Sequence, residues 1–310
     1  MGDYLARWLF IAGCALVGAA ALAAFGVGVD FGSAWPRLEF VLLLLFLAAV
    51  LSPLAKTRPG LRRPIEVAVD FSLSLAQLVV ALAVIAPLSY LAAAPAFPLV
   101  DAELARLDAA LGFDWDGYAR WVGERPALGR FLQGAYDSLR YQPLAALLAG
   151  SVLHTGERNR EVIWLTCLGL GLCIAVSVVT PAMGMGERAG LAYAEALKEV
   201  RSGGWSAVNY DNFQGIVTFP SFHTASAVFL IYIARRSAWL LRVSVPLNLT
   251  MIAATPLGGG HYLVDLLAGA AVAGVCILVV RRLAGRRSDA AAAPASPQPD
   301  ALVKGRLSPG

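Results

Sequence analysis

Long runs of apolar residues are the feature of this sequence that most constrains its fold. Several runs approach about 20 residues, the length at which a helix crosses a bilayer core. A lipid-exposed segment must satisfy its own backbone hydrogen bonds, and these runs lack the alternation of barrel strands, so we expect helices. The eight runs cover approximately residues 8–28, 38–55, 67–94, 131–154, 162–183, 220–234, 238–257 and 261–281. The sequence therefore predicts an all-α, polytopic membrane bundle of about eight transmembrane helices.

The composition supports this class and excludes others. Of the 310 residues, 58% are hydrophobic and 15% are charged, and the mean hydropathy is +0.66. Soluble domains have about 45–50% apolar and about 25% charged residues, so a soluble enzyme and a disordered chain are excluded. The net charge of +4 comes largely from short basic clusters between apolar runs. Such clusters are typical of topology signals, and we expect no nucleic-acid partner.

With eight spans, three basic clusters fall on the same side of the membrane. They consist of Lys56, Arg58, Arg62 and Arg63; of Arg235, Arg236 and Arg242; and of Arg281, Arg282, Arg286 and Arg287. The positive-inside rule makes this side cytoplasmic. We therefore expect an integral protein of a bacterial inner or plasma membrane, with both termini cytoplasmic and the long connections 95–130 and 184–219 outside.

The same pattern suggests four regions of the chain. Residues 1–95 hold amino-terminal spans, of which the third begins the core, and 96–130 form an extracytoplasmic amphipathic connection. Residues 131–282 form a catalytic membrane core, and 283–310 form a disordered cytoplasmic tail rich in Ala, Pro and Ser. The first run is long for the apolar part of a signal peptide, so we expect it to be retained as a span.

His261 and Asp265 form the first candidate catalytic pair. On a helix their i, i+4 spacing puts both side chains on one face. A carboxylate that accepts the proton of one ring nitrogen makes the other a better nucleophile or base. The glycines at 258–260 would let a substrate approach closely. A salt bridge at a helix end is the alternative, but an acid inside a membrane is costly and indicates function.

His223 lies in the stretch 219–224, which reads Phe-Pro-Ser-Phe-His-Thr. Proline and serine are typical of a helix start, where free N–H groups bind anions. We expect Ser221 to help hold phosphate and His223 to protonate a departing oxygen, with an ordinary capped helix start as the alternative. Both motifs fall at the outer ends of their spans, so together they predict phosphoryl transfer through a phosphohistidine.

Other charged residues are candidates for binding the substrate. Arg188 and Arg201 lie in the outer connection and would bind phosphate, unless each is an ordinary surface charge. Within the fourth run, Asp137 and Arg140 either neutralise each other or line a head-group pocket, to which Tyr262 would also belong. No cluster has metal-ligand spacing, and the four cysteines lie inside apolar runs, so we expect no metal and no cofactor.

At these residues the sequence resembles the type 2 phosphatidic acid phosphatase superfamily. The stretch 219–224 resembles its Pro-Ser-x-His element, and His261–Asp265 resembles its His-x-x-x-Asp element. The Phe-Pro-Ser-x-His and His-Tyr-x-x-Asp forms are similar to the inositolphosphotransferase branch, which includes inositol phosphorylceramide synthase. Stretches 111–115 and 180–184 also resemble bacterial members. The resemblance covers about residues 100–282 and implies a metal-free core of six helices, the third to eighth spans.

The resemblance also implies roles for individual residues. His261 would be the nucleophile, Asp265 its partner, His223 the general acid, and Ser221 a phosphate ligand. Two family elements are missing: a lysine followed by an Arg-Pro pair, and a Ser-Arg pair, whose place is taken here by Ala254-Thr255. Phosphate would then be held by fewer or different cations, which fits the inositolphosphotransferase branch better than a simple phosphatase.

The resulting expectation is a membrane-embedded lipid phosphatase or phosphotransferase, similar to the inositolphosphotransferases. Its partners would be a lipid phosphate substrate, the bilayer and an alcohol acceptor. One alternative is a polyprenyl phosphate or diphosphate phosphatase of the same superfamily. Alternatives of another class are a lipid transporter or flippase, which would place its polar site near the midplane, and a non-catalytic lipid-binding protein.

Overall fold

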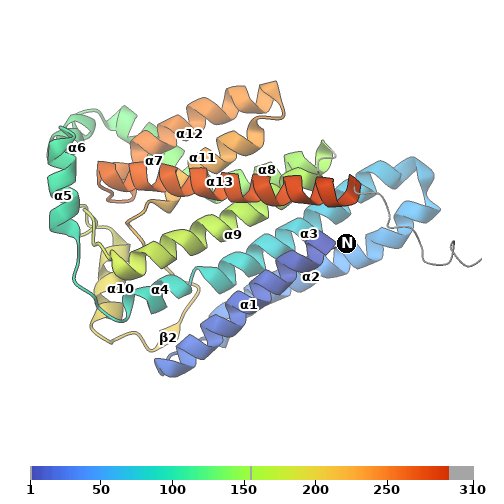
Figure 1. Cartoon of the computed structure of the whole chain (residues 1–310), viewed down its shortest axis with the longest axis horizontal. Coiled ribbons are helices and arrows are strands. Elements are labelled where there is room, and N and C mark those ends of the chain that lie inside the picture. The colour runs from blue at the N-terminus through green and yellow to red at the C-terminus, as the bar shows by residue number, and fades with distance from the viewer. Residues whose placement is uncertain (1, 154–155, 293–310) are drawn as a thin grey trace, which may run out of the picture.

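The computed structural model describes residues 2–153 and 156–292, and these form a bundle of helices (Figure 1). The first part of the chain contains α1 (Gly2–Ala24), β1 (Gly28–Val29), α2 (Phe31–Thr57), the 3₁₀ helix η1 (Pro59–Leu61), α3 (Arg62–Ile85) and α4 (Leu88–Ala93). The middle contains α5 (Asp101–Ala110), α6 (Trp115–Gly123), α7 (Pro126–Asp137), the 3₁₀ helix η2 (Ser138–Arg140), α8 (Gln142–Val152) and α9 (Gly156–Val179). The last part contains α10 (Ala192–Arg201), β2 (Ala207–Val208), α11 (Phe222–Ala234), α12 (Ala238–Gly258) and α13 (Leu263–Ala292).

Every predicted apolar run lies largely in helix, which confirms the all-α class. Among the described residues, six helical stretches are long and apolar enough to cross a membrane, and α8 and α11 are shorter apolar helices. The chain is therefore an integral membrane protein. The fourth run is not one continuous helix, because η2 separates α7 from α8. Pro143, in the first turn of α8, cannot donate a backbone hydrogen bond to the preceding turn, which accounts for a break at this point.

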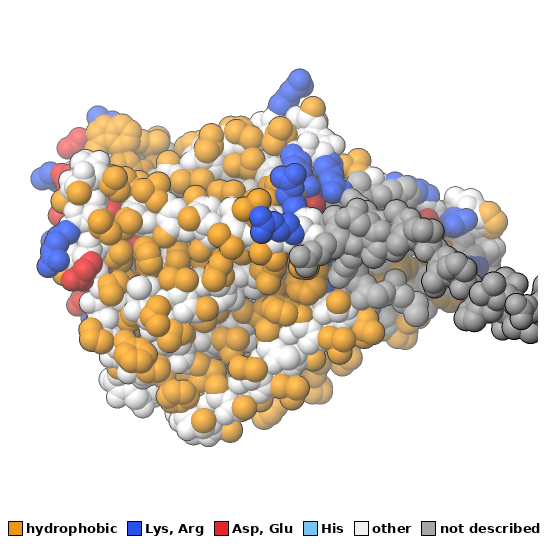
Figure 2. All heavy atoms as spheres, viewed as in Figure 1, with side chains coloured by type: hydrophobic (Ala, Val, Ile, Leu, Met, Phe, Trp, Pro, Cys, Tyr) orange, Lys and Arg blue, Asp and Glu red, His pale blue; other side chains and the backbone are white. Residues whose placement is uncertain are grey.

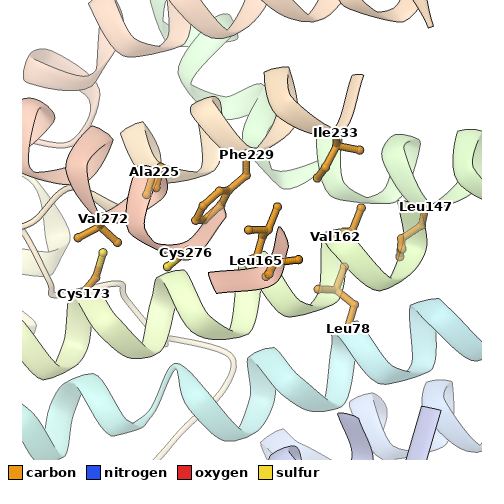
Figure 3. Close-up of a cluster of buried hydrophobic side chains, with 12 residues drawn as sticks. Leu78, Leu147, Val162, Leu165, Cys173, Ala225, Phe229, Ile233, Val272 and Cys276 are labelled. Atoms are coloured by element: carbon orange, nitrogen blue, oxygen red, sulfur yellow. The ribbon is translucent and has the colours of Figure 1, made fainter. Parts of the chain in front are cut away.

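Helix α9 lies in the middle of the bundle and contacts α3, α4, α8, α11 and α13. Figure 3 shows the apolar core that these helices share, with Leu78 of α3, Leu147 of α8, Leu165 of α9, Phe229 of α11 and Cys276 of α13 pointing toward one another. All five side chains are almost fully buried. The core thus joins the helix that carries His223 to the helix that follows His261.

The first two helices pack on α3 at the side of this bundle (Figure 1). Helix α2 is also tied to the segment after α10, because β1 pairs with β2 and Arg37 donates to the Tyr210 carbonyl at 2.7 Å. Large apolar side chains of α2, such as Phe46, are exposed, as expected for a surface in contact with lipid.

The two ends of the bundle differ in charge. Acidic side chains show mainly at the end that carries α5 and α6, where Lys and Arg also show, and a further group of Lys and Arg lies toward the opposite end (Figure 2). Helix α1 begins at that second end, where α13 also ends (Figure 1). Helix α13 runs to Ala292 and so continues into the segment 283–310, for which we expected disorder. The remainder of that segment, 293–310, lies outside the described residues.

Candidate active site

His261 lies in the loop just before α13, and Asp265 lies in the first turn of that helix. His261 Nδ1 is 3.1 Å from Asp265 Oδ2, which also accepts a hydrogen bond of 2.9 Å from the backbone N–H of Tyr262. His261 is 3% exposed and Asp265 0%. The carboxylate therefore favours the tautomer that carries the proton on Nδ1 and leaves the lone pair of Nε2 available.

His223 lies in the first turn of α11, which Ser221 caps as predicted. Ser221 Oγ accepts from the Thr224 N–H at 3.3 Å, and the same oxygen lies 3.5 Å from Nε2 of His261. The Ser221 N–H donates to the Asp265 carbonyl at 3.1 Å. At Gly269 of α13, an added Cβ would collide with the Ser221 carbonyl, so glycine permits this close approach. The structure thus brings the two predicted motifs together.

His223 and His261 both line a cavity of about 110 Å³. Its other polar side chains include Tyr136, Tyr193 and Thr218, and most of the rest are apolar groups such as Leu170 and Phe222. None of the described residues that line it is Lys, Arg, Asp or Glu. A phosphate in this cavity would therefore meet hydroxyl, imidazole and backbone groups and no cationic Lys or Arg side chain.

Tyr136 of α7 is a site residue that the sequence reasoning missed. Its ring stacks on His223, with centroids 4.2 Å apart and planes at 14°, and its hydroxyl is 3.5 Å from His223 Nδ1. The residue occurs in an apolar run, where an aromatic side chain gives no signal of function. The only local signal is its position beside the polar group Asp137–Arg140, which breaks the fourth run.

The glycines before His261 admit protein groups close to the histidine. A Cβ at Gly259 would lie 2.6 Å from His261 Cδ2 and 2.9 Å from the Tyr136 hydroxyl. Gly260 has a φ of +63°, which favours glycine, and its carbonyl accepts from the Met185 N–H at 2.6 Å. We had expected these glycines to make room for substrate, but much of that space is occupied by Tyr136 and the loop around Met185.

Tyr193 lies on the wall of the same cavity and contacts this loop. Its hydroxyl donates to the Met183 carbonyl at 3.0 Å. Burial, and then the nearby Asp265 carboxyl, raises the pKa of Tyr193, so the hydroxyl stays protonated at neutral pH. Tyr193 therefore presents a neutral hydroxyl to the cavity, and its one proton is donated to Met183.

Two acids of α5, the half-buried Asp101 and the buried Asp108, hold the backbone around the site, and sequence reasoning missed both. Asp108 accepts from the N–H groups of Leu263 and Val264 at 2.8 and 2.9 Å, and so caps α13. Asp101 accepts from the N–H groups of Met183 and Gly184 at 2.9 and 2.7 Å. Their i, i+7 spacing, on the same helix face as buried Leu104, was the available signal.

The cations predicted to bind phosphate lie elsewhere. Arg188 forms an exposed ion pair of 2.9 Å with Asp116, and Arg201 donates to the Phe97 carbonyl at 2.8 Å. Lys198, the third cation of this connection, is bound by Glu187 and Glu195, which hold its pKa above the ordinary value. The structure does not bring Arg188 or Arg201 to the cavity, and their role in binding phosphate stays a prediction.

The three residues suggested for a head-group pocket are also separate from the cavity. Arg140 pairs with Asp137 at 3.0 Å on the exposed surface of η2, so the two charges neutralise each other. Tyr262 is buried, and its hydroxyl is 3.3 Å from Asp101 Oδ1. Thr255, at the place of the family's arginine, is buried and donates to the Met251 carbonyl at 2.8 Å. These contacts give the side chains structural roles. A head-group pocket built from Asp137, Arg140 and Tyr262 stays a prediction.

Comparison with known proteins finds one family. The sequence model of the PAP2 superfamily matches residues 102–279, which is more than half of the chain. The matched region contains both histidine motifs, Tyr136 and Asp108, and leaves out α1, α2 and α3. No curated protein and no solved structure gives a significant match.

Proposed function

Because the chain belongs to the PAP2 superfamily, the type 2 phosphatidic acid phosphatases, we propose that it cleaves a phosphate ester of a membrane lipid through a phosphohistidine on His261. Membership of this superfamily supports the assignment as a lipid phosphatase-type enzyme that acts in a bilayer. The observation that carries the finer proposal is the orientation of His261. Its Nδ1 is held by Asp265, its Nε2 lies 3.5 Å from Ser221 Oγ, and the residue lines the same cavity as His223.

In the first step, the lone pair of His261 Nε2 attacks phosphorus and forms an N–P bond. The P–O bond to the leaving alcohol breaks, and His223 supplies the proton that this oxygen needs. The Asp265 carboxylate, which accepts the Nδ1 proton, stabilises the positive charge that develops on the His261 ring. Ser221 Oγ, 3.5 Å from Nε2, is placed to donate a hydrogen bond to a phosphoryl oxygen.

In the second step, His223, now neutral, accepts a proton from the attacking alcohol or water. The new O–P bond forms as the N–P bond breaks, which restores His261. Both steps use the same two histidines with their roles reversed. This reversal explains why a single cavity suffices for both half-reactions.

The charge of the cavity favours a phosphodiester donor and transfer to an alcohol. A phosphodiester such as phosphatidylinositol is singly charged, whereas a polyprenyl diphosphate carries two or more negative charges. Burying extra charge without a cation is costly, and the described cavity lining contains no Lys or Arg. We therefore place the protein with the inositolphosphotransferase-like enzymes, with the diphosphate phosphatase as the competing outcome.

The position of the site disfavours a transporter. His223 and His261 lie at helix ends, in the first turn of α11 and just before α13, whereas transporters usually bind substrate near the bilayer midplane. By the distribution of Lys and Arg, we propose that this end is extracytoplasmic and that both termini are cytoplasmic.

The test is an assay of purified protein in mixed micelles containing EDTA. Phosphatidylinositol labelled in its phosphate is supplied with and without ceramide as acceptor, and phosphatidic acid and a polyprenyl diphosphate are supplied separately. The His261→Asn variant is the matched control. After an alkaline quench, which preserves phosphohistidine, the labelled protein is separated and counted.

We expect an acceptor-dependent phospholipid product and an alkali-stable, acid-labile label on the wild type, with neither in His261→Asn. If the wild type, but not His261→Asn, releases inositol phosphate from phosphatidylinositol or free phosphate from phosphatidic acid, the phosphohistidine is kept but transfer is replaced by hydrolysis. If the wild type turns over the donor but carries no label that is lost in His261→Asn, the mechanism is contradicted. No product from any donor would favour the non-catalytic lipid-binding alternative.

A further inference from the structure

A second cavity, of about 160 Å³, lies between α8, α11 and α12 at the end of the bundle opposite to the histidines. It reaches the last turn of α11 and the first turns of α12, whereas the proposed active site uses the start of α11 and the end of α12. Ala145 and Ala149 of α8 and Leu230 of α11 contribute to its walls. Most of this wall is apolar, so it fits a hydrocarbon chain.

Arg158 also lines this second cavity. The residue is only 2% exposed, and its Nε and Nη1 atoms are buried without a hydrogen-bond partner among the described residues. Glu161, less than one turn further along α9, is bound instead by Arg235, at 2.8 and 3.1 Å, and by Arg236 at 3.4 Å. A buried guanidinium normally has an anionic partner, so the site requires one that the described protein groups do not supply.

From this combination we infer a binding site for an anionic phospholipid. Its headgroup phosphate would accept hydrogen bonds from the guanidinium of Arg158, and one acyl chain would occupy the apolar cavity. Guanidinium groups bind phosphate with strong, directional hydrogen bonds. In the sequence around the site, Arg158, Arg160, Arg235 and Arg236 outnumber Glu157 and Glu161, so the local charge also favours an anion.

A phospholipid suits the site better than free phosphate. The cavity offers few polar groups besides Arg158, such as Gln142 and Ser244, and the helices around it are apolar. Basic pockets between membrane helices on the cytoplasmic side are known to hold anionic headgroups. Such a lipid would occupy the membrane leaflet opposite to the proposed substrate, and the inference does not depend on the reaction at His261.

The test measures which lipid the full-length protein retains. The protein is reconstituted in nanodiscs of phosphatidylcholine with a minor fraction of phosphatidylglycerol, released into neutral detergent, and examined by native mass spectrometry. We expect the wild type to retain phosphatidylglycerol at least about tenfold above its bulk proportion, since a hydrogen bond to a charged group is worth such a factor. In Arg158→Gln this enrichment should disappear.

Two further variants separate the binding site from general effects of charge or folding. Arg242→Gln removes an exposed charge at the same end and should keep the enrichment. Ala149→Phe fills the cavity while keeping Arg158, and should lose the bound lipid even if Arg158→Gln fails to fold. Equal retention by Ala149→Phe and the wild type would overturn the proposal. So would equal losses in both arginine variants, or displacement of the lipid by millimolar inorganic phosphate.

Discussion

Tyr136 lies flat against His223, with ring centroids 4.2 Å apart and planes inclined by 14°. Two glycines of α12 and its C-cap allow this arrangement, because a Cβ at Gly258 would lie 2.5 Å from Tyr136 Cγ and a Cβ at Gly259 2.9 Å from its hydroxyl. The stack fixes the plane of the imidazole that we propose as general acid. It also links α7 to α11, two helices that are far apart in the sequence.

Substitution of Tyr136 should separate the effect of the stack from that of the hydroxyl. Tyr136→Phe keeps the ring, and we expect kcat within about fivefold of the wild type. Tyr136→Ala frees the His223 ring, and because positioned acid–base catalysis contributes about 10²–10⁴-fold, we expect a loss of at least about tenfold. Steady-state kinetics with the micellar donor measure both. Equal losses in the two variants would show that the hydroxyl, and not stacking, is what matters.

Asp265→Asn should reduce kcat by about 10²–10⁴-fold while the protein remains folded. The amide can still accept from the Tyr262 N–H, but it no longer supplies the charge that favours the Nδ1–H tautomer of His261 and stabilises its imidazolium. Single-turnover labelling of His261 should slow by the same factor. Glu124→Gln, at an exposed acid paired with Arg125, is the control and should be unchanged. Full labelling rates in Asp265→Asn would remove this carboxylate from the mechanism.

Gly259→Ala should abolish most turnover by steric displacement of His261 or Tyr136. Its φ of −113° suits any residue, so the effect would come from the crowded Cβ and not from backbone strain. Gly274→Ala is the matched control, because a Cβ there meets nothing within 4 Å and alanine favours a helix by about 0.5–1 kcal/mol. We expect the control to be active and slightly more stable in thermal unfolding. An active Gly259→Ala enzyme would contradict the described packing.

Asp108→Ala should lower the free energy of unfolding by about 1–2 kcal/mol, as expected for loss of a helix cap. The Leu263 and Val264 N–H groups would lose their shared acceptor, and the start of α13 next to His261 would loosen. Thermal unfolding in detergent, followed by circular dichroism, measures the change. Glu103→Gln, at an exposed position of the same helix, should leave the unfolding temperature unchanged. Stability equal to the wild type in Asp108→Ala would refute the capping role.

Cysteine labelling tests the proposed orientation in the membrane. Arg106→Cys on α5 should react with an impermeant maleimide in intact spheroplasts, because we place that end of the bundle outside. Lys56→Cys at the end of α2 should react only after permeabilisation. Both parent residues are exposed, and Cys167, Cys173 and Cys276 are buried, which limits background labelling. The reverse pattern would place the histidines on the cytoplasmic side.

Much of the helical architecture could be predicted because a lipid environment leaves few choices to an apolar segment. The capped helix start at Ser221 was also predictable, since its signal lies within a few residues. The break at η2 was not predicted, although Pro143 and the charged pair beside it signalled one. Asp101 and Asp108 fall within the predicted extracytoplasmic connection 96–130 and were not singled out, because composition does not reveal which acids fold inward.

The sequence by itself determined the spans and the pairing of His261 with Asp265. His261 lies just before α13 and not on the helix as expected, but the two side chains still meet, because only four positions separate them and Asp265 lies in the first helical turn. Only the tertiary structure decided that Tyr136 would stack on His223, 87 positions away, and that Asp108 would cap a helix start 155 positions away. It also decided that Arg188 pairs with Asp116 and that Arg201 binds the Phe97 carbonyl, both outside the cavity. These outcomes depend on how helices pack against one another, which hydropathy and motif spacing do not specify.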